Sequence, residues 1–243
     1  MRRLAAIFAH PDDETFATGG TIARYTADGV RCSLYCATDG DAGRSSGIPV
    51  SSRADLGVLR RNELRAACEI LGIAPFVCGG HPDGALQSVD PDQVIGEIVA
   101  LLRRERPDVV VTFGPEGAPT QHRDHKTISR LATAAFFLAG ATTAFPEQLA
   151  GGVTPHRPAR LAFSTWRTPA PDALLPAEGQ PIHVAVPVRD WLPRKTAAFE
   201  AHRTQREHRA HFEALALTDR EYYFVAAGLP AAAGAEDLFS GLP

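Results

Sequence analysis

Leu4-Ala5-Ala6-Ile7-Phe8-Ala9 runs directly into His10-Pro11-Asp12-Asp13-Glu14, and this stretch decides the fold. The six apolar residues predict a short buried strand, and the polar residues predict a loop at its carboxyl end. Residues 18–29 then carry a helical pattern that a glycine closes. Strand, loop and helix in this order form the first part of a βαβ unit.

The same alternation continues along the chain, which favours right-handed βαβ units and a parallel sheet. We therefore predict an α/β protein with a Rossmann-like three-layer fold, a mostly parallel sheet and an active site at the carboxyl ends of the strands. Residues 169–179, which are rich in proline, are the best candidate for a mobile loop. The further expected strands are residues 31–38, 76–78, 108–113, 160–164, 182–188 and 219–227, and the expected helices are residues 55–72, 90–106, 131–146 and 189–209.

The composition is that of an ordinary globular protein. The 243 residues are 44% hydrophobic and 22% charged, which suits one domain with a sizeable core. We predict a single domain over residues 1–243, with an α/β core in residues 1–150 and an extension of it in residues 151–243. The formal net charge of −3, without a long basic run, argues against nucleic acid or an anionic membrane as a partner.

Signals for export or membrane insertion are weak. The apolar stretch before His10 is shorter than the core of a signal peptide. The longest uncharged run, residues 131–146, falls short of the roughly 20 residues that a membrane span needs. We therefore expect a cytoplasmic protein with no membrane span.

The loop at residues 10–14 concentrates charge. One imidazole and three carboxyl groups directly follow a buried strand, and such clustering is costly unless a cation offsets it. Acidic residues near a helix N-terminus stabilise it by about 0.3–1 kcal/mol each. Helix capping therefore explains part of the pattern, but it explains neither His10 nor the doubled aspartate.

A second polar loop follows the apolar run of residues 109–113 and contains His122, Asp124 and His125. If the two strands are neighbours, both loops lie at the same edge of the sheet. His10, a carboxylate from the first loop, and His125 or His122 then form a set of two imidazoles and one carboxylate. Such a set binds a divalent metal and leaves positions open for water and substrate.

Hydrolysis is the natural use of such a site. Zn²⁺ held by two neutral imidazoles and one carboxylate remains a Lewis acid and lowers the pKa of bound water towards about 7. The remaining carboxylate of the Asp12 and Asp13 pair is placed to act as a general base. Whichever of His122 and His125 is not a ligand can protonate the leaving group or bind the oxyanion, with Asp124 to orient it and raise its pKa.

The His-Pro-Asp-Asp-Glu loop and the later His-x-Asp-His segment resemble the LmbE-like/PIG-L family of metal-dependent de-N-acetylases, which act on N-acetylglucosamine-type substrates. The resemblance extends from residue 4 to about residue 140 and includes residues 38–43, 60–72 and 82–86. It implies a zinc-dependent hydrolase that removes the acetyl group from an N-acetylated amino sugar conjugate, with Fe²⁺ as the alternative metal. It also makes residues 1–150 the metal-binding part, a small amino sugar the substrate, and a homo-oligomer the expected assembly.

The resemblance assigns a role to each candidate site residue. The metal ligands would be His10, Asp13 and His125, and the general base would be Asp12. His122 would be the acid or the oxyanion-binding group, supported by Asp124. Arg60 and Asp83 fall where members of the family contact sugar hydroxyls.

Two positions depart from the family pattern and bear on the choice of substrate. Arg123 stands where many relatives have proline, and Thr120 stands where some have a tyrosine near the oxyanion. The segment from Lys195 to Gln205, which contains His202, is similar to a C-terminal helix in the subgroup that makes or recycles sugar-linked low-molecular-weight thiols.

Two other functions fit parts of the sequence. A sugar-binding protein on the same fold would keep the ligands and lose Asp12, whereas here the ligand, base and acid candidates are all present, which favours an enzyme. The segment Gly43-Arg44-Ser45-Ser46-Gly47 matches the nucleophile elbow of a serine esterase, with Ser45 as nucleophile. An elbow requires a sharp strand-to-helix turn, and Ile48-Pro49 follows this segment instead of a helix.

Overall fold

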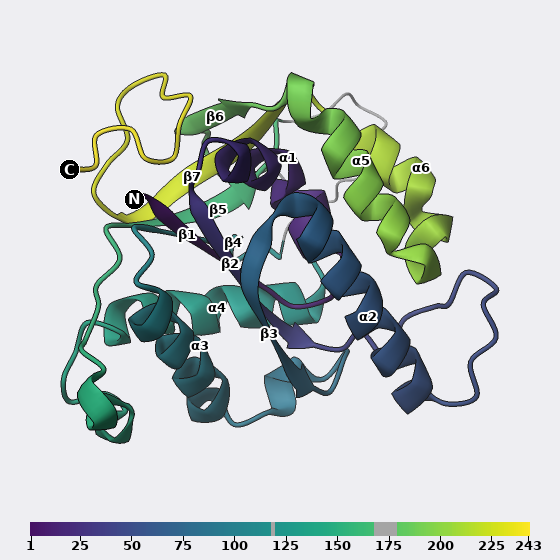
Figure 1. The fold of residues 1–243 in the computed structure, drawn as a ribbon, viewed down its shortest axis with the longest axis horizontal. Helices are drawn as coiled ribbons and strands as arrows, with labels where there is room; N and C mark the ends of the chain where they lie inside the picture. Colours follow the sequence, from purple (N-terminus) through teal and green to yellow (C-terminus); the bar gives the residue numbers. More distant parts are fainter. Residues whose placement is uncertain (118–119, 168–178) are drawn as a thin grey trace.

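The structure is a computed structural model, and it describes residues 1–117, 120–167 and 179–243. In these residues seven strands form a central sheet in the order β3-β2-β1-β4-β5-β7-β6, with helices on both faces (Figure 1). The predicted α/β fold with a mostly parallel sheet is confirmed. The strands are β1 (Arg3–Phe8), β2 (Arg31–Thr38), β3 (Ile73–His81), β4 (Val109–Phe113), β5 (Arg160–Thr165), β6 (Val184–Pro187) and β7 (Arg220–Gly228).

The helices divide between the two faces of the sheet. Helices α3 and α4 lie together on one side, and α1, α2 and α5 pack against one another on the other side (Figure 1). This arrangement produces the three layers. The helices are α1 (Asp13–Ala27), α2 (Arg53–Leu71), α3 (Pro91–Glu105), α4 (Arg123–Leu138), α5 (Leu192–Ala201) and the short α6 (Arg209–His211).

The apolar run near the start of the chain becomes a central strand. Strand β1 pairs in parallel with β2 on one side and with β4 on the other, so that Leu4 lies between Cys32 and Val109. The strand order reverses at β1, and the loops after β1 and β4 therefore open at the same point on the carboxyl edge. The neighbour relation on which the predicted site depends is thus confirmed.

The second half of the chain completes the sheet with an antiparallel edge. Strand β5 is parallel to β4, whereas β7 runs antiparallel to both β5 and β6. Strands from both sides of residue 150 therefore belong to the same sheet.

Two helices begin earlier than the sequence predicts. Helix α1 begins at Asp13 rather than at residue 18, because its first turn buries polar side chains in place of apolar ones. Helix α4 covers Arg123–Leu138 instead of residues 131–146, since His122 caps a first turn whose charged residues hide the helical pattern. In both cases the polar residues that obscure the helix are candidate site residues.

The helix expected over residues 189–209 is divided. Helix α5 ends at Ala201, and a 3₁₀ turn, Arg203–His208, follows. The break falls at His202, whose ring turns towards Glu14 in α1. Among the strands, residues 76–78 extend into β3, residues 182–188 shorten to β6, and the last strand is confirmed as β7. The candidate mobile loop lies, except for Gly179, outside the described residues.

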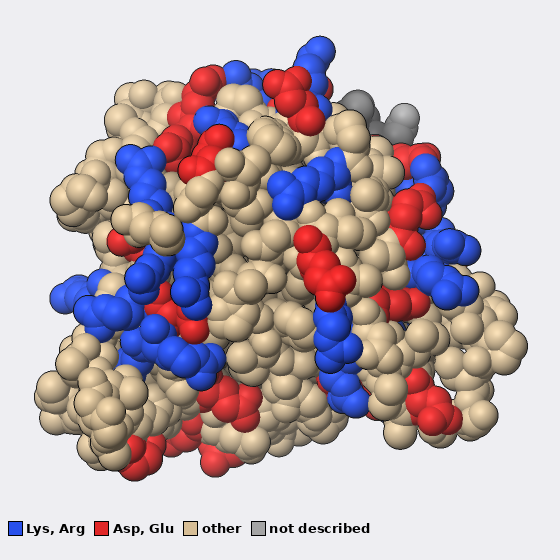
Figure 2. Space-filling view, in the orientation of Figure 1, with Lys and Arg blue, Asp and Glu red and all other residues tan. Residues whose placement is uncertain are grey.

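Charge is distributed without a strong bias on the face seen in Figure 2. Acidic and basic side chains are interspersed over most of this face. None of the helices in the described ranges is long and apolar enough to span a bilayer.

A buried arginine anchors the C-terminal residues to the sheet. Arg160 in β5 has no exposed surface, and its guanidinium donates hydrogen bonds to four main-chain carbonyls. These carbonyls belong to Leu229, Pro230, Leu238 and Ser240.

We expect Arg160→Met to lower the free energy of unfolding by about 3 kcal/mol, because the buried carbonyls lose a charged donor. Urea denaturation measures this loss. The control is Arg2→Met, which removes an exposed 3.2 Å ion pair with Asp237 and should change stability by less than about 1 kcal/mol. Equal losses in the two variants would contradict the anchoring role.

Candidate active site

The site is assembled from two loops at the carboxyl edge of the sheet. His10 follows β1 and Asp13 begins α1, whereas His122 caps α4 and His125 lies in its first turn. The ring of His125 stacks on Phe113 at the end of β4, with 4.1 Å between ring centroids. The pairing of β1 with β4 therefore brings the two predicted motifs into contact.

The three predicted ligands converge on one point. His10 Nδ1 lies 3.2 Å from His125 Nε2 and 3.4 Å from an oxygen of Asp13. The other oxygen of Asp13 lies 3.2 Å from His125 Nε2. Tetrahedral zinc with bonds of about 2.0–2.2 Å holds its ligand atoms about 3.3–3.5 Å apart. The donor types and their spacing therefore fit a divalent metal.

The carboxylate of Asp13 is held by the backbone of the same loop. It accepts hydrogen bonds from the amides of His10, at 2.8 Å, and Ala9, at 3.2 Å. Although burial acts to raise it, the neighbouring His125 and His10 hold the pKa of Asp13 well below its usual range. Asp13 is thus kept as an oriented anion, the form that binds a cation.

The far side of the His10 ring meets two further carboxylates. His10 Nε2 lies 3.1 Å from Asp83 and 3.3 Å from Asp124. Burial acts to lower the pKa of His10, but hydrogen bonds from Asp124 and Asp13 raise it well above its usual value. A metal-binding histidine usually donates its second ring N–H to a carboxylate, which fixes the tautomer. Asp83 and Asp124 therefore leave Nδ1 of His10 free to face Asp13 and His125.

Asp83 and Asp124 are themselves fixed by main-chain amides. Asp124 accepts from Gly84 at 2.7 Å and from Leu86 at 3.1 Å, and Asp83 accepts from Ala42 at 2.9 Å. Burial opposes the shift, but the hydrogen bond and charge of His10 lower the pKa of Asp83 to about 2. Both groups are anions that orient His10. The carboxylate of Asp124 therefore contacts His10. The sequence predicted that this carboxylate orients His122, but the group of Asp124 that contacts His122 is the backbone amide.

His122 lies beside the three ligands. Its Nδ1 accepts a hydrogen bond from the amide of Asp124 at 3.2 Å, and its ring meets that of His10 edge-on at 4.7 Å. Burial, followed by the charges of His10 and His125, lowers the pKa of His122. A neutral ring whose Nδ1 accepts carries its proton on Nε2. His122 is therefore a neutral hydrogen-bond donor.

Two other groupings of ligand atoms also lie within bonding range of a metal. One combines His10, His122 and His125, and the other combines His10, Asp83 and Asp124. In the first, His122 already uses Nδ1 to cap α4. In the second, both carboxylates contact Nε2 of His10 and orient that ring from the side opposite Asp13 and His125. These commitments favour the set of His10, Asp13 and His125.

Asp12 lies at the N-cap of α1 in an unusual backbone conformation. Its φ of 110° is in the left-handed region, which is strained for a residue other than glycine. Its amide donates to Glu14 at 3.0 Å, and its carboxylate lies 3.3 Å from the guanidinium of Arg60. Burial raises the pKa of Asp12 to about 6, and the charge of Arg60 opposes the rise.

Arg60 in α2 is buried beneath the catalytic loops. It donates to the carbonyls of Pro11, at 2.6 Å, and Gly40, at 2.8 Å, as well as to Asp12. Gly40 has a positive φ, and a side chain there would lie 2.2 Å from the guanidinium, so glycine is required for this approach. Arg60 and Asp83, the two predicted sugar contacts, both line the cavity of the site, and their contacts within the protein also hold the loops.

The site opens into a cavity of about 750 Å³. One end holds the residues described above, and the other is built from segments after residue 160. Among the latter, Trp166, Gln205, His208, Leu215 and Tyr222 line the wall, and of these only Gln205 lies in a segment that the sequence analysis singled out. The predicted site residue Asp124 does not line the cavity but contacts His10, which does. Ser45, the nucleophile expected of a serine esterase, is not part of the described lining either.

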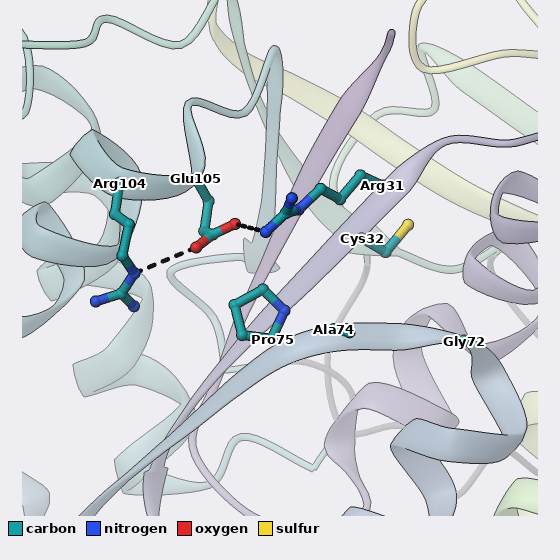
Figure 3. A pocket seen from close by; sticks show the side chains of 7 residues that line it. All are labelled: Arg31, Cys32, Gly72, Ala74, Pro75, Arg104 and Glu105. Atoms are coloured by element: carbon teal, nitrogen blue, oxygen red, sulfur yellow. Dashed lines mark hydrogen bonds and ion pairs between the residues drawn. The ribbon is translucent and has the colours of Figure 1, made fainter.

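A second hollow, of about 730 Å³, lies at the opposite edge of the sheet, beside the amino ends of β2 and β3 (Figure 3). Glu105 lies between Arg31 and Arg104 and forms ion pairs with both, at 2.8 and 3.2 Å. Both groupings of possible metal ligands in the described residues contain His10, which lines the cavity at the carboxyl edge, so that cavity remains the better candidate site.

A family model and known proteins match this chain. The model of the PIG-L family, described as GlcNAc-PI de-N-acetylase, matches residues 5–136. The chain belongs to this family of de-N-acetylases.

Curated relatives of two kinds are similar to the chain. A 1D-myo-inositol 2-acetamido-2-deoxy-alpha-D-glucopyranoside deacetylase of Rhodococcus opacus is 35% identical, over 84% of this chain and 82% of the relative. A probable N-acetyl-alpha-D-glucosaminyl L-malate deacetylase 2 of Bacillus anthracis is 30% identical, over 84% of this chain and 81% of the relative. Among solved structures, the conserved protein TT1542 of Thermus thermophilus shares the fold with a TM-score of 0.73 and 28% identity, covering 96% of this chain and 98% of that one.

Metal content distinguishes the alternative ligand sets. We expect His125→Ala to lose most bound zinc after dialysis, because a ligand is removed, and His122→Ala to keep it. Elemental analysis of both purified variants measures this difference. Loss of zinc from His122→Ala to the same extent would instead support the set of three histidines.

The support of His10 can be tested separately. Asp124→Asn should weaken zinc binding by about 10- to 100-fold, because one of the two carboxylates that accept from Nε2 of His10 becomes a neutral amide, which is a weaker acceptor. Competition with a chelating dye measures the affinity. An affinity equal to that of the wild-type chain would show that Asp124 does not act through His10.

Proposed function

We propose that the chain is a zinc-dependent hydrolase that removes the acetyl group from an N-acetylglucosamine conjugate. The observation that carries the proposal is the placement of Asp12 beside the His10, Asp13 and His125 set at the end of one cavity. Membership in a family of de-N-acetylases supports the same activity. A metal bound by the three ligands supplies Lewis-acid activation of the attacking water and of the acetamide carbonyl.

Asp12 is the proposed general base. At neutral pH a carboxyl group with a pKa of about 6 is mostly ionised and still accepts a proton readily. Arg60 fixes its position, since the guanidinium contacts both the carboxylate of Asp12 and the carbonyl of Pro11. Asp12 removes a proton from the water that attacks the acetamide, and the same proton is then available to the departing amine. The products are acetate and a free amine.

His122 is the proposed oxyanion-binding group. Its neutral ring presents an Nε2–H donor, since Nδ1 is occupied by the amide of Asp124. Such a donor stabilises the negative charge that develops on the carbonyl oxygen during attack. Of the two roles left open by the sequence, oxyanion binding is favoured over proton donation because the pKa of His122 is lowered.

The substrate is proposed to be a glucosaminide with a small polar aglycone. The relatives are named for an inositol and a malate conjugate, and a cavity of about 750 Å³ has room for a sugar and an aglycone of that size. We further propose that zinc is the physiological metal, with Fe²⁺ as the alternative, and that the protein acts in the cytoplasm and assembles as a homo-oligomer.

A sugar-binding protein without catalysis is the second candidate on this fold. Asp12 separates the two functions, because sugar binding does not require a partly buried carboxylate held in a left-handed conformation next to the proposed ligands. The presence of this strained residue favours the enzyme.

Acetate release tests the activity. Protein stripped by a chelator and reloaded with zinc is incubated with the inositol conjugate, the malate conjugate and N-acetylglucosamine itself. We expect zinc-dependent release from at least one conjugate and little from the free sugar. Tight binding of a conjugate without release would support the sugar-binding protein.

Asp12→Asn tests the base. We expect bound zinc to be retained and kcat to fall by about 10²- to 10⁴-fold, since the proton acceptor is lost while the ligands remain. Acetate assays and elemental analysis are run on the same preparation. Loss of zinc from this variant would make Asp12 a ligand and would reverse the roles of the two aspartates.

A further inference from the structure

The break between α5 and the following 3₁₀ turn places a buried histidine behind the catalytic loop. His202 has no exposed surface, and its Nε2 lies 2.8 Å from Glu14, a carboxylate that is also fully buried. Burying an ion pair costs free energy that its own attraction often does not recover. The pair therefore requires an explanation beyond stability.

Glu14 connects His202 to the backbone of Asp12. One oxygen of Glu14 faces His202 and accepts from the hydroxyl of Thr15, while the other accepts from the amide of Asp12 at 3.0 Å. This amide belongs to the residue with φ of 110°. Glu14, which accepts a hydrogen bond from the strained backbone of Asp12, is thus itself in contact with His202 in the C-terminal part of the chain.

Thr204, two residues further on, contacts the helix that carries Arg60. Its amide and hydroxyl donate to the two oxygens of Glu63, at 3.0 and 2.6 Å. Glu63 and Arg60 lie three residues apart on α2 and share one face of that helix. Arg60 in turn contacts the carboxylate of Asp12 and the carbonyl before it.

The same segment also fixes the loop that follows β2. Gln205 donates to the carbonyl of Arg44 at 3.1 Å, and the hydroxyl of Ser46 donates to the carbonyl of Thr204 at 2.6 Å. Residues 202–205 therefore join α1, α2 and this loop, all of which border the catalytic cavity.

We propose that residues 202–205 are a positioning segment for the general base, in which His202 acts through Glu14 on the backbone of Asp12, and Thr204 acts through Glu63 on α2, the helix that brings Arg60 to the side chain of Asp12. This inference rests on the proposed role of Asp12. It adds two positioning residues, neither of which touches the metal ligands directly.

The test compares His202→Leu, which removes the donor to Glu14, with His202→Gln, whose side-chain amide retains one. We expect His202→Leu to lower kcat by about 10- to 100-fold, because a catalytic group displaced by about 1 Å loses that much rate. Zinc affinity and KM should stay unchanged, and His202→Gln should recover most of the rate. A fall in zinc affinity parallel to the fall in kcat, or no recovery in His202→Gln, would overturn the inference.

The matched control is His156→Leu, which removes a partly buried histidine that bonds to the Pro107 carbonyl at the opposite edge of the sheet. It should alter thermal stability without changing kcat. If His202→Leu does not fold, Thr204→Val provides the second variant and should lower kcat in the same way, with zinc affinity retained. Unchanged kcat in a folded variant of either residue would refute its positioning role.

A crystallographic measurement separates this inference from the proposed function. In zinc-loaded His202→Leu we expect the Asp12 amide to lose its bond to Glu14 and the φ of Asp12 to leave the left-handed region. An unchanged Asp12 backbone would refute the inference whether or not the chain is active. Absence of acetate release by the wild-type chain would refute only the proposed function.

Discussion

The parallel pairing of β1 with β4 is the constraint on which the site depends. These strands lie far apart in the sequence. Their carboxyl ends meet because β1 pairs with β2 along one edge and with β4 along the other. The pairing brings the first turn of α4 to the loop before α1, so the candidate ligands come together from the starts of two helices. Anionic groups are favoured at helix N-termini, and Asp13 and Asp124 both occupy such positions.

Much of this arrangement could be predicted from the sequence, because local and functional signals coincide in the first half of the chain. Continuous apolar runs identified β1 and β4, and the candidate ligands lie in the segments that follow these two strands. The starts of α1 and α4 could not be predicted, since residues such as Asp13 and His125 occupy positions that apolar residues take in an ordinary helix. The contacts of Asp124 were also hidden, because its partners Gly84 and Leu86 come from a loop remote in sequence.

Apart from residues 195–205, the wall of the cavity contributed by the second half of the chain had no sequence signal. Tyr222 and Trp166 reach the cavity because β5 and β7 are neighbours, and an antiparallel strand inserted between two earlier ones cannot be inferred from periodicity. The break at His202 is similar in origin. Helical propensity continues through it, and only the buried partner Glu14 explains why the chain turns there.

The strand order also sets a sequence of events during synthesis. Strand β6 is made before β7 and is joined to the other strands of the sheet through it, so β6 has no strand to pair with until β7 has emerged. All three candidate ligands, by contrast, are complete once α4 begins. A nascent chain would therefore possess its metal-binding groups well before residues 202–205 arrive, and the catalytic loop would gain its final support late in translation. A chain cut short before residue 202 would carry the candidate ligands without the segment that supports the loop after β1.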